Sequence, residues 1–156
     1  MVEIEGIDRL VIGVKDLDKG LALFGEVLGA KFQEVKGGPA DLAGVRLAID
    51  LDKHLELISP VDPKDMNPPD PVTLARWLEE RGDGLLYALV LRVKDLDSAI
   101  RELQSKGIRI VGNRIERETV EQFGLQGFKE VCLCEDDTFG IKIALVEYQR
   151  TDSPVS

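Results

Sequence analysis

Apolar and polar positions along the chain form two successive patterns of the same kind. In the first, a run rich in β-branched residues at 7–14 predicts a strand, and Asp16 is placed to cap a following helix. That helix has one apolar face at helical spacing, and Gly29 is placed to end it. The face consists of Leu17, Leu21, Phe24, Val27 and Leu28. Further strands are predicted at 30–35, 45–51 and 54–58, with turns at 37–39 and 52–53.

The second half repeats this order. Val14-Lys15-Asp16-Leu17-Asp18 recurs as Val93-Lys94-Asp95-Leu96-Asp97. A strand at 85–93 precedes the repeated motif, and a helix carrying Leu96, Ile100 and Leu103 follows it up to Gly107. Strands are predicted at 108–111, 129–134 and 141–146, with a turn at 136–138. The sequence therefore predicts two copies of one β-α-β-β-β unit, produced by duplication.

Two segments lie outside the repeated pattern. The segment 60–83 contains five of the seven prolines, four of them within 63–71, and a short predicted helix at 72–81, which is typical of a linker. The segment 114–128 is charged and contains glycines, and it is predicted to be an irregular mobile flap and a candidate lid. The expected boundaries, within one compact domain, are a first module at 1–62, a linker at 63–83, a second module at 84–150 and a tail at 151–156.

Composition restricts the partners and the location of the protein. The 156 residues are 44% hydrophobic, and no apolar run approaches the roughly 20 residues that span a membrane. The acidic start has no signal-peptide pattern, so a cytoplasmic location is expected. A net charge of -9 argues against nucleic acid and anionic membranes as partners. Cys132 and Cys134 are expected to be reduced, packed thiols.

Two tandem β-α-β-β-β units with V-K-D-L-D at each strand-to-helix junction resemble the vicinal oxygen chelate superfamily. This family includes glyoxalase I, methylmalonyl-CoA epimerase, extradiol dioxygenases and bleomycin-binding proteins. The resemblance covers 4–148, and the stretch 78–85 is most similar to the epimerase branch. It implies an α+β fold in which the two modules form a curled mixed sheet around a cavity, and it implies a homodimer.

The resemblance also identifies the positions of the family's metal ligands. Family members hold a divalent metal with four side chains, one from each of four strands. The position five residues before the Val of V-K-D-L-D, a His in epimerase-like members, is Arg9 in the first copy and Ala88 in the second. The acidic position of the E-L-I-x-P pattern is retained as Glu56, and the last position is Ala144. Because methyl groups and a guanidinium do not ligate metals, no metal cofactor is expected.

The altered positions suggest an anion site instead. Because the family positions converge, Arg9 is expected to pair with Glu56 where the metal would lie. Strand alternation places His54 on the face of Glu56, Lys142 on the face of Ala144, and Arg92 further along its own strand. Such positive groups suit a carboxylate, a phosphate or a CoA-type anion. The leading hypothesis is therefore a metal-independent protein that binds a small anionic organic molecule.

Several alternatives remain open at this level. The main rival is an isomerase or lyase in which Glu56 removes a proton next to a carbonyl and Arg9 or His54 stabilises the enolate. A relocated divalent metal held by His54, Glu56 and either Asp50 or a cysteine is a further possibility. The ion pair of Arg9 and Glu56 can equally fill the former metal pocket without binding a ligand. The Lys142 side chain can extend into solvent. The whole chain can also be an interaction module with a collapsed cavity.

Overall fold

The computed structural model describes residues 1–36, 44–61 and 71–151. The turn expected at 37–39, most of the proline-rich stretch and the tail therefore lie outside the described residues. The chain divides into two compact units, one of residues 9–88 and one of residues 1–8 with 89–156. We describe each unit by itself.

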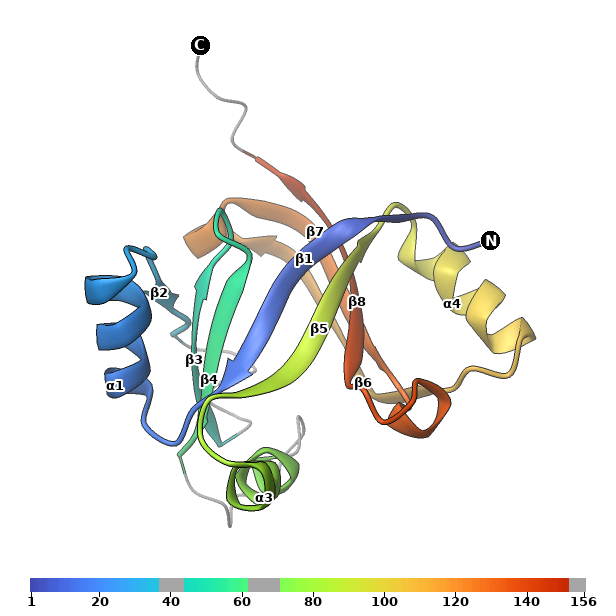
Figure 1. The fold of residues 1–156 in the computed structure, drawn as a ribbon. Coiled ribbons are helices and arrows are strands. Elements are labelled where there is room, and N and C mark those ends of the chain that lie inside the picture. Colours follow the sequence, from blue (N-terminus) through green and yellow to red (C-terminus); the bar gives the residue numbers. More distant parts are fainter. Residues whose placement is uncertain (37–43, 62–70, 152–156) are drawn as a thin grey trace. The chain divides into compact units, whose positions relative to one another are not determined.

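The unit of residues 9–88 contains a mixed sheet with the strand order β2-β3-β4-β1 (Figure 1). The strands are β1 (Ile4–Gly13), of which residues 9–13 belong to this unit, β2 (Gln33–Glu34), β3 (Val45–Asp50) and β4 (Leu55–Pro60). β4 pairs with β3 antiparallel and with β1 parallel. The helices are α1 (Leu17–Leu21), the π-helix η1 (Ala22–Val27) and α3 (Pro71–Arg81). Leu17 of α1 packs with Val14 and with Leu57 of β4 in the core.

The unit of residues 1–8 and 89–156 contains the order β5-β8-β7-β6 (Figure 1). The strands are β5 (Leu85–Val93), β6 (Ile110–Val120), β7 (Leu125–Leu133) and β8 (Ile143–Arg150). β5 and β8 are parallel, and β7 is antiparallel to both β6 and β8. The helix α4 (Leu96–Ser105) buries Leu96 and Ala99 against Val131, Leu133 and Leu145. Short 3₁₀ turns lie at η2 (Glu121–Phe123) and η3 (Glu135–Asp137).

The two copies have the same strand register, which supports the duplication. Val11, three residues before Val14, pairs with Glu56 in the parallel β1–β4 ladder. Val90, three residues before Val93, pairs with Ala144 in the β5–β8 ladder. Glu56 and Ala144 are therefore equivalent positions of the two copies, as are Arg9 and Ala88. An α+β fold with tandem β-α-β-β-β modules is confirmed.

The repeated motif forms the same helix start in both copies. Asp16 accepts a hydrogen bond from the backbone N–H of Lys19 at 3.2 Å, and Asp95 accepts one from Ser98 at 2.8 Å. Both aspartates have extended backbones, as N-cap residues do. Helix capping therefore explains Asp16 and Asp95, the first aspartate of each motif copy, without any catalytic or binding role.

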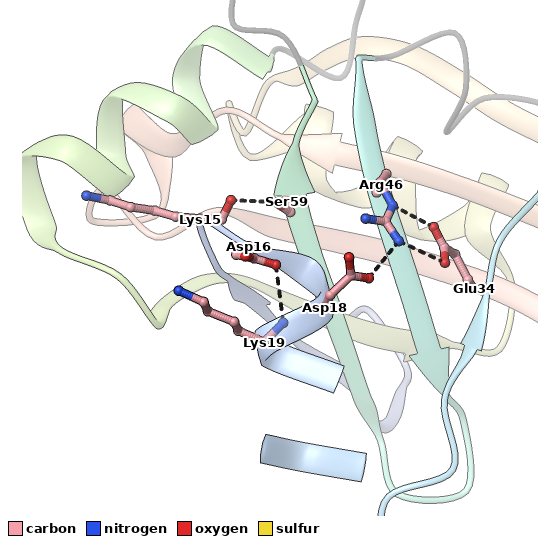
Figure 2. Close-up of polar contacts among 7 residues, drawn as sticks. All are labelled: Lys15, Asp16, Asp18, Lys19, Glu34, Arg46 and Ser59. Carbon is pink, nitrogen blue, oxygen red and sulfur yellow. Dashed lines mark hydrogen bonds and ion pairs between the residues drawn. The ribbon is translucent and has the colours of Figure 1, made fainter. Parts of the chain in front are cut away.

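Polar contacts also fix the first helix start to neighbouring strands (Figure 2). Ser59 of β4 donates to the backbone carbonyl of Lys15 at 3.0 Å. Arg46 of β3 holds Glu34 of β2 through Nε at 2.8 Å, and its Nη2 lies 3.1 Å from Asp18 of α1. These half-exposed contacts join α1 and β2 to the strands of their own unit.

The expectation of an irregular flap at 114–128 is wrong. These residues belong to an antiparallel hairpin of β6 and β7, in which Arg117 pairs with Phe128 and Val120 with Leu125. Gly124, with a φ of 61°, forms part of the turn. The charged pattern suggested a loop because β6 is mostly exposed and carries polar side chains on both faces. Backbone pairing with β7, which composition does not reveal, makes it a strand.

The apolar face expected on the first helix is only partly correct. Leu17 is buried and Phe24 packs beside it, but Val27 and Leu28 are 73% and 64% exposed. The helix changes from α to π at Ala22, and the N–H of Leu28 bonds to the carbonyl of Leu23. This wider turn rotates the later side chains away from the face that an α-helical spacing predicts. No helix in the described parts of the chain is long and apolar enough to cross a membrane.

Candidate functional site

A buried ion pair between Arg9 of β1 and Glu56 of β4 forms the centre of the candidate site. Arg9 Nε donates to Glu56 Oε2 at 2.5 Å, and each side chain is only 7% exposed. The parallel pairing of β1 with β4 brings these residues together, because Glu56 lies opposite Val11, on the same side of β1 as Arg9. A guanidinium and a carboxylate removed from water at this distance keep their charges by pairing with each other.

The equivalent positions of the second copy carry no charge. Ala88 and Ala144 are 8% and 3% exposed, so both methyl groups are buried. At the positions that the resemblance assigns to metal ligands, one copy therefore carries a guanidinium and a carboxylate, and the other carries two methyl groups. The Arg9–Glu56 pair does not fit a divalent cation, because its one carboxylate already binds the Arg9 guanidinium, which is itself a cation.

The expectation that His54 shares a strand face with Glu56 is wrong. His54 lies in the turn before β4, is exposed, and has a φ of 58°. Its carbonyl accepts from the N–H of Leu10 at 2.9 Å, and its N–H donates to Leu51 at 3.2 Å. Strand alternation does not apply to a residue in a left-handed turn conformation, which histidine adopts more readily than most side chains.

Lys142 and Arg92 lie in the other compact unit, and each has an acidic neighbour there. Lys142 is 15% exposed, and its Nζ lies 3.4 Å from Glu135 Oε1. Arg92 Nε lies 3.2 Å from Glu5 Oε2 without hydrogen-bond geometry, while its Nη2 donates to the carbonyl of Tyr148 at 2.7 Å. The structure accordingly gives both cations a partner within their own unit.

The residues considered for a relocated metal have other roles. Asp50 is buried and accepts from the backbone N–H groups of Lys31 at 2.6 Å and Lys53 at 3.1 Å. Asp50 therefore holds the turn that follows β3 and the segment that leads into β2. Cys132 and Cys134 form no disulfide in the described residues, and both are half-buried. Among the residues that the structure describes, no group of three or more His, Cys, Asp or Glu side chains is arranged to hold a metal.

A second buried polar pair was not predicted from the sequence. Tyr148 of β8 donates through its hydroxyl to Asp8 Oδ1 at 2.5 Å, and the residues are 5% and 4% exposed. Burial and this hydrogen bond raise the pKa of Tyr148 to about 12. Asp8 directly precedes Arg9 in the sequence. The Asp-Arg dipeptide inside an apolar strand was the only signal in the sequence that could have indicated this buried pair.

Comparison with family models gives a match over residues 6–145 to the Glyoxalase/Bleomycin resistance protein/Dioxygenase superfamily. The chain belongs to this superfamily. The match covers both repeated modules and includes Arg9, Glu56, Ala88 and Ala144. A comparison with curated protein sequences gave no match.

Solved structures show the same fold. The methylmalonyl-CoA epimerase of Mycobacterium tuberculosis is 26% identical, with a TM-score of 0.69 over 94% of this chain and 90% of that chain. A methylmalonyl-CoA epimerase in complex with methylmalonyl-CoA and NH4+ is 20% identical, with a TM-score of 0.70 over 97% and 100%. A hypothetical protein of Bacillus halodurans C-125 is 18% identical, with a TM-score of 0.70 over 94% and 96%.

Proposed function

We propose that this superfamily member binds a small anionic organic molecule, a carboxylate or a carboxylated acyl-CoA, without a metal ion. The observation that carries the proposal is the buried Arg9–Glu56 pair at positions where the family places metal ligands. A permanently charged guanidinium supplies positive charge where a cation would otherwise attract the ligand. Glu56 holds the guanidinium in one orientation, so little side-chain freedom is lost when an anion binds.

The alanines support a binding role rather than metal chemistry. Two methyl groups in place of two ligands leave the second copy without charge, so recognition of an anion falls to the first copy. A buried ion pair contributes little net stability compared with an apolar pair of similar size. The presence of a buried charged pair at Arg9 and Glu56 is therefore better explained by binding of a ligand than by a contribution to folding stability.

Isothermal titration calorimetry with three related probes tests the proposal. Methylmalonyl-CoA carries a carboxylate that propionyl-CoA lacks, and free CoA lacks the acyl group. We expect methylmalonyl-CoA to bind at least about tenfold more tightly than propionyl-CoA, the effect of one charge-assisted hydrogen bond. Equal affinity for all three probes, or no binding by any of them, would contradict the proposal.

Two variants separate the site from general charge effects. Arg9→Met combined with Glu56→Leu removes both charges together, so no buried charge is left unpaired. This double variant is expected to fold and to lose the preference for methylmalonyl-CoA. Arg101→Met, which removes an exposed arginine of α4, is the matched control and should bind as the wild type does.

A second candidate function is an isomerase or lyase of the epimerase type, favoured by the 26% identity to the Mycobacterium tuberculosis enzyme. Here Glu56 would accept the proton next to the thioester carbonyl, and Arg9 would stabilise the enolate. Deuterium incorporation from solvent into methylmalonyl-CoA, abolished by Glu56→Gln, would establish this activity. Binding of methylmalonyl-CoA without any exchange would support the binding function and exclude this activity.

The association state and location complete the proposal. We expect the chain to form a homodimer in the cytoplasm, as related proteins commonly pair their sheets between two copies. Light scattering coupled to size exclusion would give twice the mass of 17.2 kDa for a dimer. A single-chain mass across micromolar concentrations would rule the dimer out.

A further inference from the structure

Two cysteines separated by one residue belong to the unit of residues 1–8 and 89–156. Cys132 lies in β7, and Cys134 follows the last residue of that strand. Cys134 keeps an extended backbone, with a φ of -67° and a ψ of 124°, and its N–H donates to the Arg109 carbonyl at 2.9 Å. The strand geometry therefore continues through Cys134. Because side chains alternate along a strand, both thiols lie on the same face of the sheet.

This face of the sheet is the one that α4 does not cover. Val131 and Leu133, which alternate with the cysteines, belong to the core that β7 forms with α4. Cys132 pairs with Val111 of β6 and with Ala144 of β8. Paired residues of neighbouring strands point to the same face, so the thiol lies beside the Ala144 methyl group. Both cysteines are only half-buried, so neither is enclosed in the core between the sheet and α4.

The backbone that carries the two thiols is fixed on both sides. Cys132 lies in the middle strand of three, between β6 and β8. The Cys134 carbonyl accepts from the Asp137 N–H at 3.0 Å and from the Thr138 hydroxyl at 3.3 Å. A pair of ligands on a backbone that is already ordered loses little conformational freedom when an ion binds.

The spacing of the thiols suits a bridging ion better than a disulfide. Cα atoms two residues apart on a strand are separated by about 6.4–6.8 Å, at the upper limit for a disulfide. Their Cβ atoms are about as far apart, beyond the roughly 4.5 Å that an S–S bond allows. An ion with metal–thiolate bonds of about 2.3 Å holds two sulfurs up to about 4.6 Å apart. An ion can therefore join two thiols that cannot bond to each other.

Two thiols without further ligands select a soft monovalent ion. Structural zinc takes four ligands, and no group of three or more His, Cys, Asp or Glu side chains in the described ranges is arranged to hold a metal. Cu(I) prefers thiolates, and two of them in line complete its coordination. The resulting complex has one net negative charge. Asp137 raises the pKa of Arg109 and Cys134 adds to this effect, so the guanidinium lies within electrostatic range to offset that charge.

We propose that Cys132 and Cys134 form a Cu(I) site, in which the two sulfur atoms of one chain bind a single ion between them. Binding replaces two S–H bonds by two S–Cu bonds and releases two protons, and no electron is transferred. The site lies within one compact unit and does not depend on the anion-binding function proposed for Arg9 and Glu56.

Competition between the protein and bicinchoninate for Cu(I), without oxygen and with a reductant present, tests the proposal. We expect the wild type to bind one Cu(I) per chain, with two sulfur ligands in its X-ray absorption spectrum. Cys132→Ser and Cys134→Ser should each weaken Cu(I) binding about a hundredfold or more, because either change removes half of the ligand set. The wild-type spectrum needs no variant, so it decides even if a serine variant fails to fold.

His54→Asn is the matched control. It removes the single imidazole of the chain, which is the other soft side-chain donor that competes for Cu(I). Asparagine tolerates the left-handed backbone at this turn, where φ is 58°. The variant should therefore keep the Cu(I) affinity of the wild type.

Each result supports or overturns the site. One Cu(I) per chain with two sulfur ligands, weakened in both serine variants and unchanged in His54→Asn, supports it whether or not methylmalonyl-CoA binds. A wild type that takes no Cu(I) from bicinchoninate, or binds it with fewer than two sulfurs, overturns it. A serine variant that binds like the wild type overturns the pair. One ion for every two chains overturns binding within a single chain, and a loss in His54→Asn as large as in the serine variants overturns the assignment to the cysteines.

Discussion

Arg9 and Glu56 lie 47 residues apart in the chain, and their side chains meet at 2.5 Å in a buried ion pair. The resemblance assigns both positions to metal ligands, and the equivalent positions of the second copy are Ala88 and Ala144. Duplication therefore produced two matching sets of positions, and only one of them is charged. This asymmetry is the basis of the function that we propose.

Breaking the ion pair from one side should destabilise the protein strongly. Arg9→Met leaves the Glu56 carboxylate buried without its cation, and we expect a loss of about 3–5 kcal/mol in the free energy of unfolding. The double variant with Glu56→Leu should recover most of that loss. Urea denaturation followed through Trp77, the single tryptophan, measures both. Equal losses in the single and double variants would show that the Glu56 carboxylate carries no penalty when it is left without its cation.

A methyl group added at Gly13 should lower the stability of the protein. A Cβ at this position of β1 would lie 3.0 Å from the Leu74 side chain of α3, with Leu85 and Leu78 just beyond. Gly13→Ala is therefore expected to cost about 1–3 kcal/mol through overpacking. Gly25→Ala is the matched control, because its nearest contact is 3.5 Å from the Ala30 carbonyl. Similar melting temperatures for the two variants would refute this packing at Gly13.

Alkaline pH should weaken the fold through Tyr148. In the unfolded chain a tyrosine ionises near pH 10, whereas in the folded protein the pKa of Tyr148 is raised to about 12. The folded state therefore binds more protons than the unfolded state between these values, and stability is lost as the pH rises through that window. We expect Tyr148→Phe to lose less stability than the wild type from pH 10 to 12. Identical pH profiles would contradict the raised pKa.

The cap of α4 should contribute measurably to stability. Asp95 accepts from the Ser98 N–H at 2.8 Å, and Asp95→Ala removes this bond. The expected loss is about 1 kcal/mol in the free energy of unfolding. Asp95→Asn should stay near wild type, since asparagine caps helices equally well. Chemical denaturation of both variants checks the prediction, and an equal loss in the two would show that the charge matters more than the cap.

The sequence predicts most of the fold because the repeat supplies a second, independent copy of each pattern. Asp16 and Asp95 are caps in both copies, and β5 spans Leu85–Val93, as its apolar run indicates. Local patterns fail where backbone geometry departs from the ideal. The π-helix exposes Val27, and the left-handed turn removes His54 from its expected face.

The sequence also predicts the contacts of the candidate site only in part. The resemblance brings Arg9 and Glu56 together because both lie at motif positions. The contact between Asp8 and Tyr148 spans 140 residues and belongs to no motif, so nothing in the spacing of the sequence reveals it. Only the folding of residues 1–8 and 89–156 into one compact unit brings these two side chains together.

The most direct test of the central claim is the metal content of protein purified without added metal or chelator, measured by inductively coupled plasma mass spectrometry. The account predicts substoichiometric zinc, cobalt, nickel and manganese, and no change in content when Glu56 is replaced by Gln. One equivalent of tightly bound metal in the wild type, lost in Glu56→Gln, would show that Glu56 still serves as a ligand and would contradict the replacement of the metal by Arg9.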